Sequence, residues 1–255
     1  MDWSNIKAAI YRGNRGILKP VRDIDYVDID SLIGISRQKD MLLKNTKNFI
    51  ENKMASHTLL WGERGCGKSS LIKAVFTKFV GNNLRIIEIS KDDLVNLADI
   101  IDEIRDEKEY RFIIFCDDLS FEDSDISYKY LKVVLEGSIE KTPSNVLIYA
   151  TSNRRHLIKE LKKDNEDTTI LDGEIHYGDA VEEKLSLSDR FGLWISFYQG
   201  SYSEYLKIID SYFNGYEVDR SKLHEEAKKF AMLRGSRSGR TAKQFFINYK
   251  KALSE

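Results

Sequence analysis

Residues 62–69 read Gly62-Glu63-Arg64-Gly65-Cys66-Gly67-Lys68-Ser69 and contain the pattern G-x-x-x-x-G-K-[ST]. An apolar run at 57–61 precedes this octapeptide, and a helix-like stretch at 68–80 follows it. A glycine-rich turn between a strand and a helix is the context in which this pattern forms a phosphate-binding loop. We therefore expect a nucleotide site here, rather than a glycine-rich turn that carries a surface lysine.

The residue types in this loop suit phosphate for physical reasons. The three glycines let backbone N–H groups turn inward, and the N-terminus of the following helix adds partial positive charge. We expect Lys68 to reach the β- and γ-phosphates and the Ser69 hydroxyl to ligate Mg²⁺. The expected nucleotide-binding residues of the loop are Gly62, Glu63, Arg64, Gly65, Cys66, Gly67, Lys68, Ser69 and Ser70.

A second site element follows another apolar run. Residues 111–116 predict a buried strand, and Asp117 and Asp118 come directly after it. Two adjacent carboxylates at the end of a buried strand need a cationic partner, because burying unpaired charge is costly. We expect Asp117 to bind Mg²⁺ and Asp118 to polarise the attacking water. The alternative is a strand end with two solvated aspartates.

The order of strand-like and helix-like runs predicts an α/β fold. Strand-like runs lie at 57–61, 84–89, 111–116, 145–151 and 193–197, and helical patterns lie between them at 68–80, 91–109 and 124–140. Such alternation, with strands apolar throughout, indicates a five-stranded parallel sheet in a three-layer α/β/α core. Residues 202–212, 221–233 and 241–253 then predict three helices. The expected parts are an N-terminal arm at 1–28, a nucleotide-binding domain at 29–198 and a small helical domain at 199–255.

Taken together, these features resemble the AAA+ ATPase superfamily, and the resemblance spans residues 30–250. It implies ATP and Mg²⁺ as ligands, and it identifies the C-terminal helices as a lid. The strand at 145–150 followed by Thr151-Ser152-Asn153 resembles the sensor-1 strand, which implies that Asn153 orients the lytic water. An ordinary strand-end turn is the alternative for these polar residues.

Residues 186–192, Ser-Leu-Ser-Asp-Arg-Phe-Gly, resemble the segment that carries an arginine finger. This implies that Arg190 reaches the γ-phosphate bound by a neighbouring subunit, a role that suits the permanent charge and planar fork of arginine. The alternative is a structural salt bridge to Asp189 or Glu183.

Two further segments match motifs of the superfamily. Residues 235–242 resemble sensor 2, where an arginine of the lid reaches the phosphates. Arg240, at the start of the final helix, is the expected residue, and Arg237 is the reserve. Residues 29–35 resemble the segment that lines the adenine, which implies contacts from Leu32, Ile33 and Ile35, although plain core packing explains each of them equally well.

More closely, the chain resembles an uncharacterised bacterial AAA+ family that is known as a domain of unknown function. The stretches that carry this impression are 60–62, 115–121, 149–158 and 186–192. In that family paired aspartates at the positions of Asp117 and Asp118 are normal. The resemblance implies a fold and ATP chemistry, without a biological role.

Composition excludes several protein classes. No run approaches eighteen apolar residues, so a transmembrane helix is not expected, and residues 1–21 lack the apolar segment of a secretory signal. Cys66 and Cys116 make neither a disulfide framework nor a zinc site, and the four histidines form no ligand set. A cytoplasmic location is the simplest interpretation.

The formal net charge of −1 conceals an uneven distribution along the 255 residues. Residues 1–22 carry a net charge of +4, residues 101–189 carry −10 and residues 220–255 carry +7. The basic ends could meet an acidic neighbour in a ring or a nucleic-acid backbone. Overall neutrality therefore does not exclude a nucleic-acid partner.

These features predict an ATPase that couples Mg²⁺-dependent ATP hydrolysis to remodelling or loading a protein or nucleic-acid partner, as a homo-oligomer with Arg190 acting in trans and without a membrane partner. One alternative is a nucleotide-gated binding module with little turnover, because Asp118 stands where most members of the superfamily have glutamate. Another is a P-loop kinase or GTPase, but an N-K-x-D motif is missing from the sequence downstream and the helical lid is unexplained by either.

Overall fold

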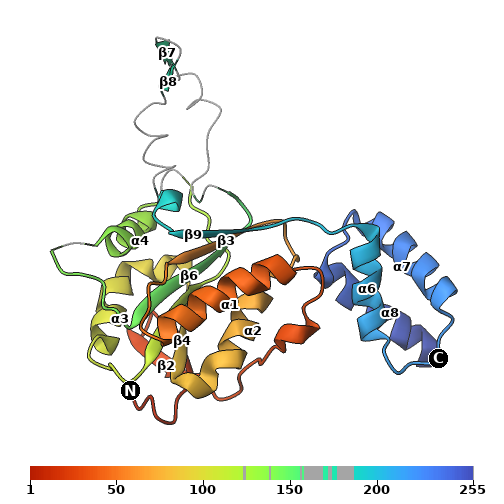
Figure 1. The fold of residues 1–255 in the computed structure, drawn as a ribbon, viewed down its shortest axis with the longest axis horizontal. Helices are drawn as coiled ribbons and strands as arrows, with labels where there is room; N and C mark the ends of the chain where they lie inside the picture. The colour runs from red at the N-terminus through yellow and green to blue at the C-terminus, as the bar shows by residue number, and fades with distance from the viewer. Residues whose placement is uncertain are drawn as a thin grey trace.

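A seven-stranded sheet in the order β2-β1-β4-β5-β6-β3-β9 forms the centre of the larger part of the protein (Figure 1). The structure is a computed structural model that describes residues 1–122, 125–137, 139–155, 157, 169–171, 174–176 and 187–254. The strands of the sheet are β1 (Ala8–Arg12), β2 (Ile17–Pro20), β3 (Thr58–Gly62), β4 (Leu84–Ile89), β5 (Arg111–Cys116), β6 (Val146–Ser152) and β9 (Leu193–Phe197).

The five strands that the sequence predicts form the parallel part of this sheet, in the order β4-β5-β6-β3-β9. The expected fold class is therefore confirmed. Two more strands extend the sheet: β1 pairs parallel to β4, and β2 pairs antiparallel to β1. Residues 1–28, expected as an arm, thus contribute a hairpin to the edge of the same sheet.

A buried arginine on β4 holds the N-terminal segment in place. Arg85 is 2% exposed, and its Nε donates to the carbonyl oxygen of Trp3 at 2.8 Å. Its guanidinium lies 4.4 Å from the centre of the Tyr110 ring, and the Trp3 ring packs edge-on against Phe112. The arm therefore packs on the core through a buried charge that has both hydrogen-bond and aromatic partners.

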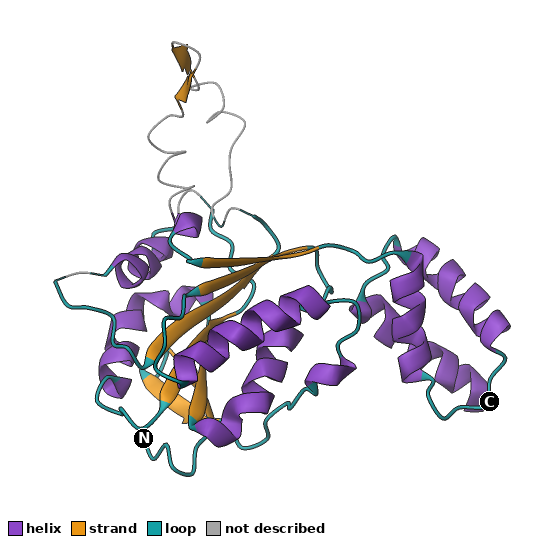
Figure 2. Cartoon of the chain, in the orientation of Figure 1, coloured by secondary structure: helices purple, strands orange, loops and turns teal. Residues whose placement is uncertain are grey.

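Helices cover both faces of the sheet (Figure 2). On one face lie α1 (Ser36–Ile50) and α2 (Lys68–Phe79), and on the other lie α3 (Leu97–Ile104) and α4 (Ser127–Glu136). Strand β5 serves both cores: Phe112, Ile114 and Cys116 face α3 and α4, whereas Ile113 and Phe115 face α1 and α2. This period of two explains why the strands read as continuous apolar runs. The 3₁₀ helices are η1 (Ile29–Ser31), η2 (Val80–Asn82) and η3 (Lys91–Asn96).

Helix α1 was not expected from the sequence, because half of its buried side chains are polar. Leu42, Asn45, Thr46 and Phe49 form its buried stripe. The Tyr149 hydroxyl of β6 lies 3.1 Å from Asn45 Nδ2 and 2.8 Å from Thr46 Oγ1, and Asn45 Nδ2 also donates to Thr58 Oγ1 of β3. Burial raises the pKa of Tyr149 to about 12, so its hydroxyl stays protonated.

The C-terminal helices α6 (Tyr202–Tyr212), α7 (Arg220–Arg234) and α8 (Gly239–Ser254) pack around a core of their own. Figure 1 shows them beside the sheet, joined to it by the chain that leaves β9. Ser201 and Glu204 form a capping box at the start of α6, which gives this helix a defined N-terminus. The boundary at residue 199 stays a prediction.

The acidic segment at 162–181 lies mostly outside the described residues. The described part of it pairs β7 (Thr169–Leu171) with β8 (Glu174–His176) in an antiparallel ladder. Within the described ranges, no helix combines the length and the apolar character that crossing a bilayer requires.

We predict that Tyr149→Phe lowers the free energy of unfolding by about 1–3 kcal/mol, because it leaves buried partners on α1 without the phenol oxygen. Urea unfolding monitored by circular dichroism measures this change. The matched control is Tyr198→Phe, since the Tyr198 side chain is 64% exposed and its hydroxyl can bond to water instead. Equal losses in the two variants would contradict the role given to the buried hydroxyl.

Candidate functional site

The loop between β3 and α2 needs glycine at two positions for steric reasons. Gly62 has a φ of +127°, and a Cβ atom there would lie 1.9 Å from the carbonyl oxygen of Phe197 on β9. Gly67 has a φ of +95° and immediately precedes the first turn of α2. Both conformations are strained for residues with side chains. The glycines predicted from the sequence therefore shape the loop at the end of β3.

Lys68 folds back beneath this loop. Its Nζ donates to the carbonyl oxygens of Gly62 and Glu63, each at 2.8 Å, and to Asn153 Oδ1 at 3.0 Å. These three acceptors match the three N–H donors of an ammonium group. Lys68 is only 7% exposed, and burial lowers its pKa below the ordinary value.

The first carboxylate after β5 lies against the start of α2. Asp117 Oδ1 accepts a hydrogen bond from Ser69 Oγ at 2.6 Å and another from Thr151 Oγ1 at 2.5 Å. Thr151 Oγ1 in turn accepts from the backbone N–H of Asp118 at 2.8 Å. The structure therefore brings together the two residues that the sequence assigns to the metal, Ser69 and Asp117.

The second carboxylate is linked to Lys68 through an amide. Asn153 Nδ2 donates to Asp118 Oδ1, while Asn153 Oδ1 accepts from Lys68. Asp118 has a φ of +52°, which is uncommon for a residue with a side chain and tolerated best by asparagine and aspartate. This left-handed turn lies where the chain leaves β5, on the side of β6 that carries Asn153.

The donor set fits Mg²⁺. Ser69 and Asp117 supply a hydroxyl and a carboxylate in direct contact, and both are hard oxygen ligands. Across the part of the chain that the structure describes, no three His, Cys, Asp or Glu side chains gather as a metal site. Mg²⁺ typically takes one or two carboxylates together with several waters and phosphate oxygens.

The lid touches the loop directly. The backbone N–H of Arg240 donates to the carbonyl oxygen of Gly65 at 3.3 Å, and a Cβ atom at Gly65 would lie 2.7 Å from Ser238 Oγ. The Arg240 side chain is exposed beside Lys68, whose pKa its charge helps to lower. Arg237 instead stacks on Tyr202, with its guanidinium 4.9 Å from the ring centre. Of the two sensor-2 candidates, Arg240 is the one beside the loop.

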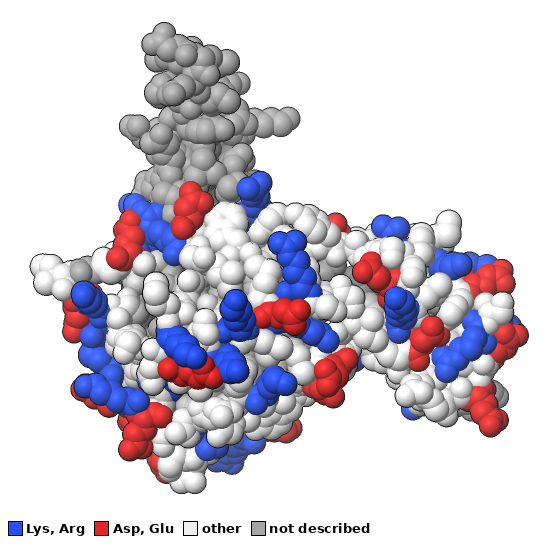
Figure 3. All heavy atoms as spheres, viewed as in Figure 1, with Lys and Arg blue, Asp and Glu red and all other residues white. Residues whose placement is uncertain are grey.

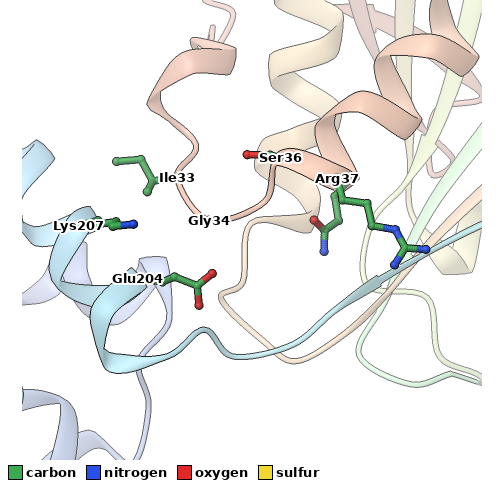
Figure 4. Close-up of a pocket in the computed structure, with 7 residues that line it drawn as sticks. Ile33, Gly34, Ser36, Arg37, Glu204 and Lys207 are labelled. Carbon is green, nitrogen blue, oxygen red and sulfur yellow. The ribbon is translucent and has the colours of Figure 1, made fainter.

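The segment expected to line the base borders both the loop and the lid. Ile35 Cδ1 lies 3.7 Å from the Cβ position of Gly67. Ile33 lines a cavity of 490 Å³ between this segment and helix α6 of the lid (Figure 4). Its other lining residues are Gly34, Ser36, Arg37, Gln38, Glu204 and Lys207.

The guanidinium of Arg190 forms an ion pair with Glu136 at the end of α4. Ser186 and Glu183, in the same motif region, lie outside the described residues. Within the loop itself, the side chains of Glu63 and Arg64 are exposed, and burial raises the pKa of the half-buried Cys66. The roles assigned to these residues stay predictions.

Sequence reasoning did not single out Thr151 and Ser238, which contribute to this site, or Glu136, the partner of Arg190. Thr151 could have been found from register, because Cys116 pairs with Ala150 and the next residues, Asp117 and Thr151, then lie side by side. The contacts of Glu136 with Arg190 and of Ser238 with Gly65 join segments far apart in the chain, and no local pattern predicts them.

Comparison with known proteins identifies the family. Residues 4–253 match the family described as "Protein of unknown function (DUF815)", and the chain belongs to this family. No curated protein matches the sequence.

Solved structures show the fold. A variant of the Thermotoga maritima protein RuvB is 16% identical with a TM-score of 0.55, over 89% of this chain and 66% of that one. A chain of the E. coli MS115-1 HORMA:CdnC:Trip13 complex is 10% identical with a TM-score of 0.53, over 86% of this chain and 90% of that one. The chain thus has the fold of the AAA+ P-loop ATPases.

The contact between the lid and the loop leads us to expect that replacing Arg240 weakens ATP binding more than replacing Arg237 does. Arg240→Ala should weaken binding of a nucleoside triphosphate about tenfold, because it removes an exposed cation beside the phosphate loop. Arg237→Ala is the matched control, since its guanidinium stacks on Tyr202, and its effect should be less than about threefold. Isothermal titration calorimetry with ATP measures both. A larger loss of ATP affinity in Arg237→Ala than in Arg240→Ala would instead assign the sensor-2 role to Arg237.

Proposed function

We propose that this chain is a Mg²⁺-dependent ATPase that couples ATP hydrolysis to remodelling or loading a protein or nucleic-acid partner. One observation carries the proposal: Lys68, Asn153 and Asp118 form a continuous hydrogen-bonded chain beside the contact of Ser69 with Asp117. Phosphate-binding, metal-binding and water-activating groups thereby converge from three neighbouring segments, namely the loop after β3 and the ends of β5 and β6. A purely structural salt-bridge network at these residues would not explain the glycine-rich loop beside it.

In this proposal Lys68 exchanges acceptors. Its ammonium is bonded to two loop carbonyls and to Asn153, so a phosphate oxygen must replace at least one of them. If Asn153 is the acceptor given up, its amide stays bonded to Asp118 and its oxygen becomes available to a water molecule. Asn153 then orients that water, and Asp118 accepts its proton.

Ser69 and Asp117 are the residues that would hold Mg²⁺, which supplies charge neutralisation at the β- and γ-phosphates. Thr151 helps to orient Asp117 by donating to Oδ1, and the same hydroxyl accepts from the N–H of Asp118. One threonine thus fixes the relative positions of both carboxylates. We assign Thr151 as a positioning residue for this reason.

The macromolecular partner is the least constrained part of the proposal. RuvB is described as a Holliday junction branch migration motor, and the second structure contains HORMA and CdnC together with Trip13. On the face shown in Figure 3, basic and acidic side chains are interspersed over the core and the lid, without a single broad basic surface. This favours a protein partner or a second copy of the chain on that face, because nucleic acid requires clustered positive charge.

A nucleotide-gated binding module is the second candidate. Asp118 has a short side chain whose Oδ1 is engaged by Asn153, so it has less reach toward a water than a glutamate has. A protein of this kind binds ATP, changes the position of its lid and hydrolyses ATP negligibly. A kinase or GTPase is less favoured, since the lid contact at Gly65 belongs to neither.

Steady-state phosphate release distinguishes the two candidates. We expect Mg²⁺-dependent release from ATP, reduced at least about a hundredfold in Lys68→Ala and in Asp118→Asn. The ATP affinity of Asp118→Asn should stay within about threefold of the wild-type value, because this substitution slows the hydrolysis step rather than ATP binding. Equal release by the wild type and Lys68→Ala, with tight ATP binding by the wild type, would favour the binding module instead.

Arg190 offers a test of assembly. Arg190→Ala should lower turnover at least about tenfold with ATP affinity unchanged, because an arginine finger stabilises transition-state charge. If it acts in trans, mixing Arg190→Ala with Asp118→Asn restores turnover, since mixed neighbours combine one intact catalytic site with one intact finger. Arg105→Ala, which removes another ion-paired arginine, is the control. Size-exclusion chromatography shows whether the two variants form mixed oligomers. If such oligomers form and turnover is not restored, action of Arg190 between subunits is contradicted.

A further inference from the structure

A cavity lies between residues 33–38 and helix α6, close to the loop that is proposed to bind phosphate. At 490 Å³ it falls in the size range of ligand pockets. Ile35 connects it to the phosphate loop, because the Ile35 side chain lies against Gly67 while the neighbouring Ile33 and Gly34 line the cavity. We infer that a nucleotide with its phosphates at Gly65–Ser69 would extend its base toward this space. This step rests on the proposed function.

One carboxylate is aimed into the cavity. Figure 4 shows Glu204 projecting from α6 toward the loop that carries Ile33 and Gly34. Glu204 Oε2 accepts from the backbone N–H of Ser201 at 2.7 Å and lies 3.1 Å from the Ser201 hydroxyl. Oε1 lies on the other side, 3.9 Å from the Cβ position of Gly34. The capping box therefore fixes the carboxylate through one oxygen and presents the other to the cavity.

Gly34 keeps that approach open. Its φ of +81° favours glycine, and a Cβ atom at this position would lie 3.8 Å from Glu204 Cβ and 3.9 Å from Oε1, so a longer side chain there would crowd Glu204. Ile33 contributes an apolar side chain to the same lining, which can contact a flat ring. A half-buried acceptor, an apolar wall and a glycine gap together have the composition of a site for an aromatic ring with an amino substituent.

We propose that Glu204 reads the base, with Oε1 accepting a hydrogen bond from the exocyclic amino group of adenine. Adenine presents one amino donor on its pairing edge, which matches the single open oxygen. Guanine presents two adjacent donors, which a carboxylate binds with both oxygens, and Oε2 of Glu204 already accepts from Ser201. Guanine also places its O6 acceptor where adenine carries the amino group, and that acceptor meets a negative charge. The structure thereby assigns Glu204 as a specificity-determining residue for ATP over GTP.

Glu204→Gln tests this assignment without removing the helix cap, because glutamine also serves at the N3 position of a capping box. Its oxygen can keep the bond from Ser201, and its amino group then faces the cavity as a donor. We expect ATP affinity to fall about tenfold while GTP affinity is unchanged or rises. Glu225→Gln, on the exposed side of α7, makes the same charge change away from the cavity and should change neither affinity.

Purine riboside triphosphate, which lacks only the amino group, is the decisive probe in calorimetric titrations. The wild type should prefer ATP to this probe about tenfold, and Glu204→Gln should not distinguish the two. If the wild type binds ATP but its preference survives in Glu204→Gln, the base-reading role is overturned while the proposed ATPase stands. Equal losses for all three nucleotides, with a lowered melting temperature, would also overturn it, since they indicate a structural role. Failure of the wild type to bind any nucleotide would instead reject the proposed function.

Discussion

The buried ammonium group of Lys68 is the point on which the site depends. A cation that is 7% exposed is stable only when its donors are satisfied, and here two loop carbonyls and Asn153 satisfy them. Those acceptors come from the loop after β3 and from the end of β6. The position of Lys68 therefore ties the conformation of the loop to the neighbouring strand, and a disturbance of either one leaves a buried charge without a partner.

The sheet supplies the positions that this arrangement needs. Because β3, β5 and β6 are parallel, their carboxyl ends meet at one edge, where Gly62 ends β3 and where Asp117 and Asn153 follow β5 and β6. The register places Asp117 beside Thr151, and α2 begins near enough for Ser69 to reach the same carboxylate. On the helical side, Tyr149 joins α1 to β6 through buried hydrogen bonds. The site thus rests on elements fixed by both apolar and polar contacts.

Sequence patterns predicted the elements that a short run of consecutive residues reveals, such as apolar strands and the glycine loop. The bounds of β4, β5 and β9 agree at both ends, and the glycine loop followed from eight consecutive residues. Helix α1 escaped prediction because Asn45 and Thr46 fill core positions that a hydropathy pattern assigns to solvent. The β1–β2 hairpin escaped because its strands are short and each is only partly apolar. What the sequence could not supply is pairing across long separations, as in the contact between Glu136 and Arg190.

The lid and the segment before α1 approach the phosphate loop from two directions, and this has a consequence for coupling. Arg240 is hydrogen-bonded to Gly65 through its backbone, whereas Glu204 borders the cavity beside Gly34. Both residues belong to one helical unit with its own core. Under the proposed roles of Arg240 and Glu204, a nucleoside triphosphate would touch this unit at two points and restrain its orientation, whereas loss of the terminal phosphate would weaken only the contact near Arg240. With one of its two contacts weakened, the helical unit would favour a different orientation relative to the sheet. A bound ligand shifts a conformational equilibrium through such a difference in its contacts with the two states.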